Sequence, residues 1–88
     1  MMELAELFKM FADSTRIKIL YSLLSSERSV GEICDDIDMN QSAVSHQLKL
    51  LRTSKLISSR REGKQMIYKL ADDHVKMIMS MGKEHIEE

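Results

Sequence analysis

Several features that would place a protein outside a reducing cytoplasm are missing from this sequence. The chain has one cysteine, Cys34, so it cannot form an intramolecular disulfide. Its apolar runs are far shorter than the roughly 20 residues that a membrane-spanning helix requires, and no secretory signal is present. Proline, low-complexity segments and internal repeats are absent as well. We therefore expect a soluble cytoplasmic protein.

A strong net charge is also missing, because 14 acidic residues offset 13 basic ones to give a formal charge of −1. The charges are nevertheless unevenly placed. Residues 41–69 hold seven basic side chains and one acidic one, a net of +6, whereas residues 27–38 hold five acidic side chains and one basic one. A basic segment in a nearly neutral chain indicates a local surface that binds a polyanion. The 88 residues allow one domain (1–88) with a modest core, to which dimerisation would add buried area.

Apolar residues at helical spacing predict three short helices in the first part of the chain. The first covers about residues 4–11. The second follows a cap at Asp13 or Ser14, and the third follows a cap at Ser29. No strand is expected in this part of the chain.

Residues 41–53 carry the clearest helical pattern and follow a plausible cap at Asn40. Val44, Leu48 and Leu51 define a buried stripe, and small polar and basic residues fall on the opposite side. Two short helices joined by a tight turn, the second with such an exposed face, are typical of a helix-turn-helix.

The pattern changes at about residues 56–70, where two strand-like segments flank a turn at Gly63. This predicts a β-hairpin wing, and a last helix follows over about residues 72–87 after a cap at Asp72. The expected fold is therefore mainly α-helical, a winged helix-turn-helix of about five helices and two strands that forms a homodimer.

Side chains suited to DNA gather on the predicted recognition helix and wing. Reading DNA requires donors and acceptors at base edges and cations at phosphates. We expect base-edge or nearby phosphate contacts from Gln41, Ser42, Ser45 and His46, and less directly from Gln47, whose phase drifts sideways. Cations expected at the DNA backbone or in the minor groove are Lys49, Arg52, Arg60, Arg61 and Lys64. The alternative for each is an ordinary solvated side chain or protection of a strand edge.

Asp72, His74, His85 and Glu88 form the pattern D-x-H-x10-H-x-x-E. Carboxylate oxygen and imidazole nitrogen suit Zn²⁺ and neighbouring divalent metals. Eleven steps of about 100° bring His85 back to the face of His74, yet the two lie about 16 Å apart along the axis, too far for one ion. Two antiparallel helices about a two-fold axis would place Asp72 and His74 against His85 and Glu88 of the second copy. The alternative is an amphipathic helix with solvated charges.

Three segments of the sequence resemble the ArsR/SmtB family of winged-helix metal-sensing transcriptional repressors: FADSTRIKIL, NQSAVSHQLKLLRTSKLISSRREGKQMIYKL and the terminal pattern. The resemblance covers almost the whole chain. It implies that a metal-free dimer binds an inverted-repeat operator and that metal weakens this binding. The terminal pattern looks like the subclass that binds Zn²⁺, Co²⁺ or Ni²⁺ between C-terminal helices, and we expect zinc. Cys34 lies away from the positions of the family's thiolate ligands, which disfavours arsenic, cadmium and lead.

Three other functions are consistent with parts of the sequence. One is a winged-helix regulator that does not sense metal. Stoichiometric zinc binding that disappears when His74 and His85 are changed would exclude this function. A metal-dependent hydrolase would need a pocket and a general base that 88 residues do not evidently supply. A pure dimerisation module would leave the basic segment unexplained. We therefore expect neither an enzyme nor a small-molecule substrate.

Overall fold

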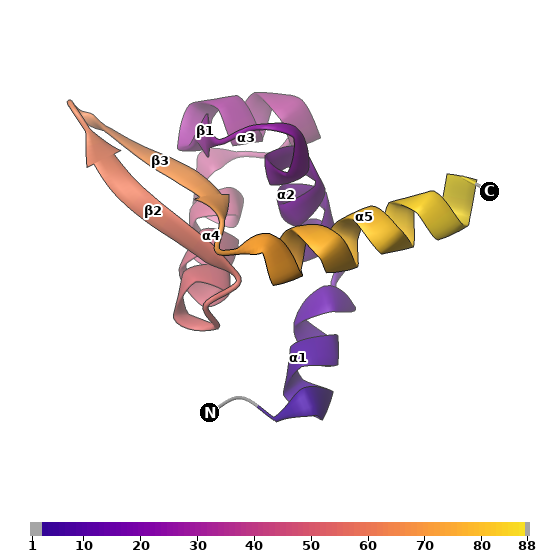
Figure 1. Cartoon of the computed structure of the whole chain (residues 1–88). Coiled ribbons are helices and arrows are strands. Elements are labelled where there is room, and N and C mark those ends of the chain that lie inside the picture. The colour runs from indigo at the N-terminus through magenta and orange to yellow at the C-terminus, as the bar shows by residue number, and fades with distance from the viewer. Residues whose placement is uncertain (1–2, 88) are drawn as a thin grey trace.

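The chain folds into a helical body from which a hairpin and two end helices project (Figure 1). The computed structural model describes residues 3–87. Within that range the elements are α1 (Leu4–Phe11), α2 (Ser14–Ser25), β1 (Arg28–Ser29), α3 (Val30–Ile37), α4 (Gln41–Thr53), β2 (Ile57–Glu62), β3 (Gln65–Leu70) and α5 (Asp73–Glu87). The body consists of α2, α3 and α4, and the wing consists of β2 and β3. The predicted winged helix-turn-helix is confirmed.

The helices of the body begin at side-chain caps. Asp13 accepts a hydrogen bond from the Arg16 backbone N–H, and Asn40 accepts one from Ala43 at 2.9 Å. Ser29 and Glu32 form a reciprocal capping box at the start of α3. These side chains satisfy backbone donors that a helix start leaves unpaired. The predicted caps of all three helices are therefore confirmed.

The core lies where α2, α3 and α4 meet. Its fully buried side chains are Ile19, Leu20, Ile33, Val44, Leu48 and Leu51. Ile57 and Leu70 extend it under the base of the wing, and Val75 and Met79 attach α5 to it. The stripe predicted for the recognition helix is thus the side of α4 that packs into the core.

Two of the connections between these elements use residues that tolerate a left-handed backbone. Asp38 (φ 55°) ends α3 and opens the turn of the helix-turn-helix, and Gly63 (φ 64°) lies in the turn of the wing. Both lie where the sequence predicted turns. Within residues 3–87, no helix has the length and apolar character needed to cross a membrane.

The sheet has one strand more than the sequence predicted. Its order is β1-β3-β2, and all pairs are antiparallel. In β1, Arg28 pairs with Tyr68 and Ser29 with Ile67. Two residues are too few to show the alternation that marks a strand, and β1 forms because the outer edge of β3 offers backbone partners. The sequence therefore predicted two of the three strands and missed the short strand β1.

Candidate DNA-binding surface and metal-ligand positions

The side of α4 away from the core presents the side chains expected to contact DNA. Gln41, Ser42, Ser45, His46, Lys49 and Arg52 are all exposed. Gln47 is half-buried, and its Oε1 atom is buried without a hydrogen-bond partner. Its sideways position agrees with its predicted phase on the helix. The exposed set combines the short polar side chains and cations that base edges and phosphates require.

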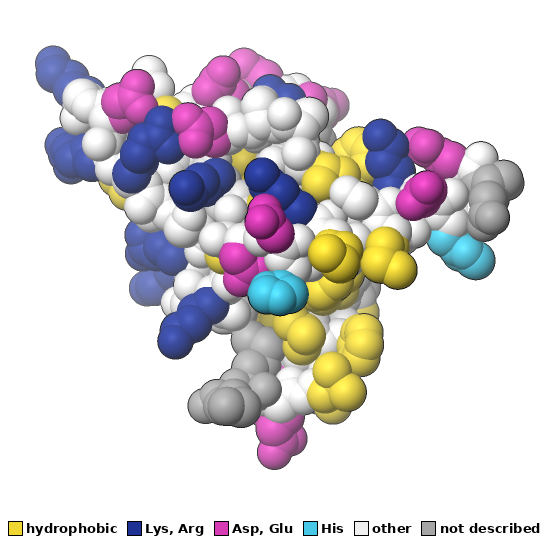
Figure 2. Space-filling view, in the orientation of Figure 1, with side chains coloured by type: hydrophobic (Ala, Val, Ile, Leu, Met, Phe, Trp, Pro, Cys, Tyr) yellow, Lys and Arg dark blue, Asp and Glu magenta, His cyan; other side chains and the backbone are white. Residues whose placement is uncertain are grey.

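The wing carries basic side chains next to this face. Arg61 and Lys64 are exposed, and Lys64 follows Gly63 in the turn. Figure 2 shows Lys and Arg side chains over the wing and along the side of the body that it adjoins, with acidic side chains among them on the hairpin. The basic surface is therefore continuous from wing to body but is partly neutralised on the wing itself.

Arg60 accounts for much of that neutralisation. Its Nη1 and Nη2 atoms donate to the two carboxylate oxygens of Glu27 at 2.8 and 2.6 Å, and Nη2 also donates to Glu62 at 2.9 Å. The hydrogen bonds from Arg60 hold the pKa of the Glu27 carboxyl below its ordinary value of 4.5, and they raise the pKa of the guanidinium. We define these three side chains as the Arg60 clasp. No local pattern in the sequence indicates a role for Glu27, because its pairing depends on the unpredicted strand β1.

Asp72 and His74 lie together at the start of α5. The Asp72 Oδ1 atom accepts hydrogen bonds from the backbone N–H groups of His74 and Val75, so Asp72 caps the helix as predicted. The same oxygen lies 3.5 Å from the Nδ1 atom of His74. The Asp72 and His74 side chains are 55% and 89% exposed, respectively, which leaves them accessible to a ligand from outside the chain.

His85 lies near the other end of α5 and is also exposed. Glu88, the fourth predicted ligand, lies outside the described residues. Between residues 3 and 87, no group of three or more His, Cys, Asp or Glu side chains could hold a metal ion. A single chain thus brings two of the predicted ligands together and keeps His85 apart, as the helical distance requires.

Exposed apolar side chains separate the two histidines on one face of α5. Ile78 and Met81 lie within about 40° of His74 around the helix and are 44% and 62% exposed. The apolar surface continues into a groove of about 630 Å³ between α1 and α5, lined in part by Leu4, Phe8 and Ile86. Figure 2 shows this surface as hydrophobic side chains over α1 and α5, with histidine side chains near both ends of α5.

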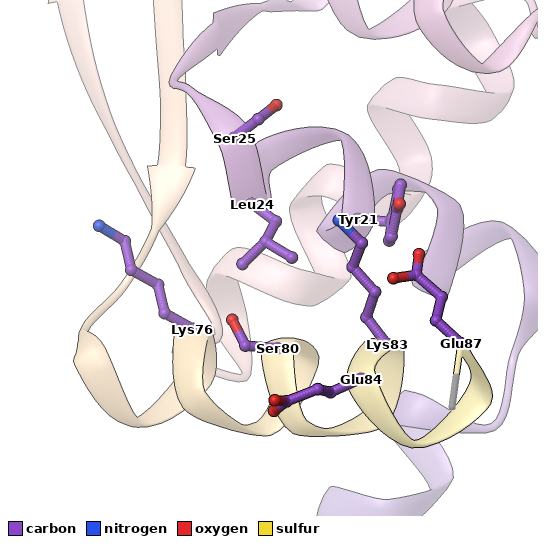
Figure 3. Close-up of a pocket in the computed structure, with 8 residues that line it drawn as sticks. All are labelled: Tyr21, Leu24, Ser25, Lys76, Ser80, Lys83, Glu84 and Glu87. Carbon is purple, nitrogen blue, oxygen red and sulfur yellow. The ribbon is translucent and has the colours of Figure 1, made fainter.

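The opposite face of α5 has a different character. It lines a polar groove against α2, into which Lys83 and Glu87 point toward Tyr21 (Figure 3). The Nζ atom of Lys83 lies 5.6 Å from the centre of the Tyr21 ring, within range of a cation–π contact. The helix is therefore amphipathic, as in the alternative interpretation of its sequence, and the histidines lie on its exposed apolar side.

The single cysteine lies apart from these groups. Cys34 is on α3, is half-buried, and packs against the core together with Val30 and Ile37. It behaves as the small packing side chain that its apolar phase predicted.

A winged helix-turn-helix with a polar and basic recognition helix defines a DNA-binding transcription regulator. The family described as bacterial regulatory protein, arsR family, matches residues 13–59, and the chain belongs to this family. The resemblance inferred from the sequence motifs is confirmed.

Relatives of known type cover nearly the whole chain. It is 35% identical to the transcriptional repressor SmtB homolog of Synechocystis sp., over 98% of this chain and 65% of that protein. It is 36% identical to the cadmium resistance transcriptional regulatory protein CadC homolog of Staphylococcus aureus, over 99% of this chain and 73% of that protein. The homodimeric winged helix-turn-helix DNA-binding domain Mb0332 of Mycobacterium bovis matches with a TM-score of 0.86 at 29% identity, over 94% of this chain and 77% of that one. The chain thus spans just under two thirds of the first of these relatives.

Proposed function

We propose that this chain is a metal-responsive transcriptional repressor that acts in the cytoplasm as a homodimer. The metal-free dimer binds an inverted-repeat operator, and Zn²⁺ bound between the two α5 helices lowers its affinity for that DNA. Co²⁺ and Ni²⁺ are alternatives to zinc. The observation that carries the proposal is the face of α5, where exposed apolar side chains lie between two exposed histidines.

DNA binding is assigned to the exposed side of α4 and to the wing. Gln41, Ser42, Ser45 and His46 are proposed to contact base edges or nearby phosphates, with Gln47 at the margin. Lys49 and Arg52 on α4, and Arg61 and Lys64 on the wing, are proposed to contact phosphates. Arg60 belongs to the same basic surface, but its guanidinium is already engaged by two carboxylates. In a two-fold dimer the two α4 helices would reach half-sites about one helical turn or more apart.

Two copies of α5 are proposed to pair in antiparallel orientation. The point midway between His74 and His85 lies between Met79 and Ser80 on α5, and Ile78 and Met81 are equally far from it. An antiparallel pair crossing at that midpoint would therefore cover the apolar residues of one copy with those of the other. The apolar groove beside α1 extends the same surface. The relative Mb0332, a homodimeric domain with the same fold, supports a homodimer as such.

The same pairing would complete a metal site at each end. Asp72 and His74 of one copy would lie beside His85 of the second copy, and Glu88 would add a further carboxylate. The donor chemistry fits Zn²⁺, because imidazole nitrogen and carboxylate oxygen are its usual ligands besides thiolate. Asp72 and His74 are also accessible to a metal ion, since their side chains lie together and are largely exposed. Bound zinc would supply a bridge between the two helices, which favours one geometry of the dimer over others.

A zinc titration tests the proposal. The affinity of the purified dimer for a promoter fragment with an inverted repeat is measured as Zn²⁺ is added, with zinc occupancy measured in parallel. We expect a loss of about 5- to 150-fold, the usual range of allosteric coupling, at about one zinc per protomer. His85→Ala should retain the metal-free affinity and lose the response. Loss of metal-free DNA binding in this variant would instead assign His85 to the DNA interface or to the fold.

A regulator that does not sense metal through α5 is the second candidate. It is favoured by one observation, that the transcriptional activator HlyU of Vibrio cholerae, whose name specifies no metal, is 36% identical to this chain over 85% of this chain and 69% of that protein. Unchanged DNA affinity at full, verified zinc occupancy would reduce the site to a structural one. Absence of zinc binding by the dimer would leave the DNA-binding regulator alone.

A further inference from the structure

The Arg60 clasp ties the three strands of the sheet together. Arg60 donates three hydrogen bonds of 2.6–2.9 Å, two to Glu27 and one to Glu62. Glu27 immediately precedes β1, Arg60 lies on β2, and β3 runs between these two strands. The clasp therefore connects both outer strands over the central one, and it joins residues 33 positions apart in the sequence.

The outer half of the wing has little else to hold it in place. Every residue from Arg60 to Gln65 is exposed, whereas the buried residues Ile57 and Leu70 lie at the base. The third strand, β1, pairs with only two residues of β3. Without the clasp, the hairpin would be joined to the body mainly through its base, so the angle of its tip would be weakly defined.

The surroundings of Arg60 make it a poor phosphate ligand. With its two carboxylate partners it forms a group of net charge −1. A phosphate would have to displace three charge-assisted hydrogen bonds and would then lie beside two carboxylates. Successive residues of a strand point to opposite faces, so Arg61 points away from this group. Within the described residues, neither Arg61 nor Lys64 forms an ion pair.

We propose that Glu27 and Glu62 hold Arg60 as a positioning residue that sets the angle of the wing, and that the wing contacts phosphates through Arg61 and Lys64. This inference rests on the proposed DNA-binding function. It has a consequence that simple electrostatics would not predict: removing the negative charge of Glu27 should weaken DNA binding rather than strengthen it.

The salt dependence of DNA affinity separates a positioning residue from a phosphate ligand. The probe is a fluorescein-labelled duplex that the wild-type protein has selected from a random-sequence pool, and Kd is measured by anisotropy at several KCl concentrations. Arg61→Gln and Lys64→Gln should each flatten the plot of log Kd against log salt, by about 0.9 for every phosphate that is no longer neutralised. Arg60→Gln should raise Kd about three- to tenfold, which corresponds to the loss of one exposed ion-pair network in each protomer. The slope should not change.

Glu27→Gln should raise Kd as much as Arg60→Gln does. The matched control is Asp35→Asn, which removes the same charge from an exposed position on α3 and should leave Kd unchanged. In the free protein, both clasp variants should speed amide hydrogen exchange in β2 and β3. The double variant should add little to either one, because each single change already opens the clasp.

Tighter DNA binding by Glu27→Gln, with a steeper slope, would overturn the inference, since Arg60 would then be a phosphate ligand that Glu27 restrains. Unchanged hydrogen exchange in the wing of both variants would overturn it as well. Failure of the wild-type protein to bind any duplex would have a different meaning: it would refute the proposed function and, with it, any role of the clasp in DNA affinity.

Discussion

Gly82 offers a direct test of the proposed pairing between α5 helices. It lies inside α5, where glycine is less favourable than alanine by about 1 kcal/mol. Apart from its chain neighbours and the nearby backbone of its own helix, a Cβ atom at this position would meet no atom of residues 3–87 within 4 Å. Packing within the protomer therefore gives no reason for glycine. Gly82 lies about 40° around the helix from Ile78, at the edge of the face proposed for the second copy, and it lines the apolar groove between α1 and α5.

Gly82→Leu should act in opposite directions on the protomer and on the dimer. Leucine is nearly as good a helix former as alanine, so the change should stabilise each helix by nearly 1 kcal/mol. That gain is common to monomer and dimer and cancels in the dissociation equilibrium. In the apolar groove that the second copy is proposed to cover, the same leucine overpacks the dimer contact at a cost of about 1–3 kcal/mol, and the two-fold axis applies this cost twice. The dissociation constant of the dimer should therefore rise at least about thirtyfold.

Sedimentation equilibrium of metal-free protein measures this dissociation constant. Ser80→Leu is the matched control, because it adds the same side chain to the polar face of α5 shown in Figure 3 and should leave the dissociation constant unchanged. Equal helix content by circular dichroism would establish that both variants fold. If Gly82→Leu dimerises as tightly as the wild type and simply melts at a higher temperature, the second copy does not cover this edge of α5, and the proposed extension of the interface into the groove is wrong.

Two further predictions concern the caps and ion pairs of the body and the wing. Asn40→Ala removes the cap of α4 and should cost about 1 kcal/mol, which a fall of about 4–8 °C in Tm would report; an unchanged Tm would show that Asn40 does not support the recognition helix. Hydrogen bonds from Arg60 to Glu27 and from the Ser29 backbone to Glu32 lower the pKa of each carboxyl below 4.5. The stability that these hydrogen bonds provide is therefore complete above pH 4.5 and is lost as the pH falls through the lowered pKa values. The two carboxyl groups should therefore contribute nothing to changes in Tm between pH 7 and 5. Below pH 4.5, the Tm of Glu27→Gln should fall less than that of the wild type. An identical dependence of Tm on pH in the two proteins would show that the clasp does not form in solution.

The sequence predicted best those parts of the fold that short-range patterns control. The recognition helix is an example, because Asn40 caps it and Val44, Leu48 and Leu51 repeat at helical spacing; its bounds agree with the prediction. The wing is another, since Gly63 marks its turn. In both cases the deciding interactions lie within a few residues of each other, where spacing alone determines which side chains meet.

The parts that the sequence did not predict depend on distant contacts. Strand β1 forms only by pairing with β3, whose partner residues lie about 40 positions later in the sequence. The engagement of Arg60 by Glu27 follows from that strand, so the ion-pair network around a residue predicted to contact DNA could not be foreseen from its charge. For α5, spacing predicted that His74 and His85 share a face, but their exposure depends on which side of the helix packs on the body.

The arrangement of α5 explains how an ion at its ends could alter DNA affinity without touching DNA. Val75 and Met79 anchor this helix to the core that also holds α4, while Ile78 and Met81 lie about 100° away around the helix, on the face proposed for the second copy. Each α5 is thus fixed to the core that positions its own recognition helix, and in the proposed dimer a change in the angle between the two α5 helices would move the two α4 helices relative to each other. Two recognition helices engage one duplex only when their separation matches about 34 Å or a multiple of it. Ligands at the ends of α5 lie farthest from the crossing point, where a bridging ion constrains that angle most strongly.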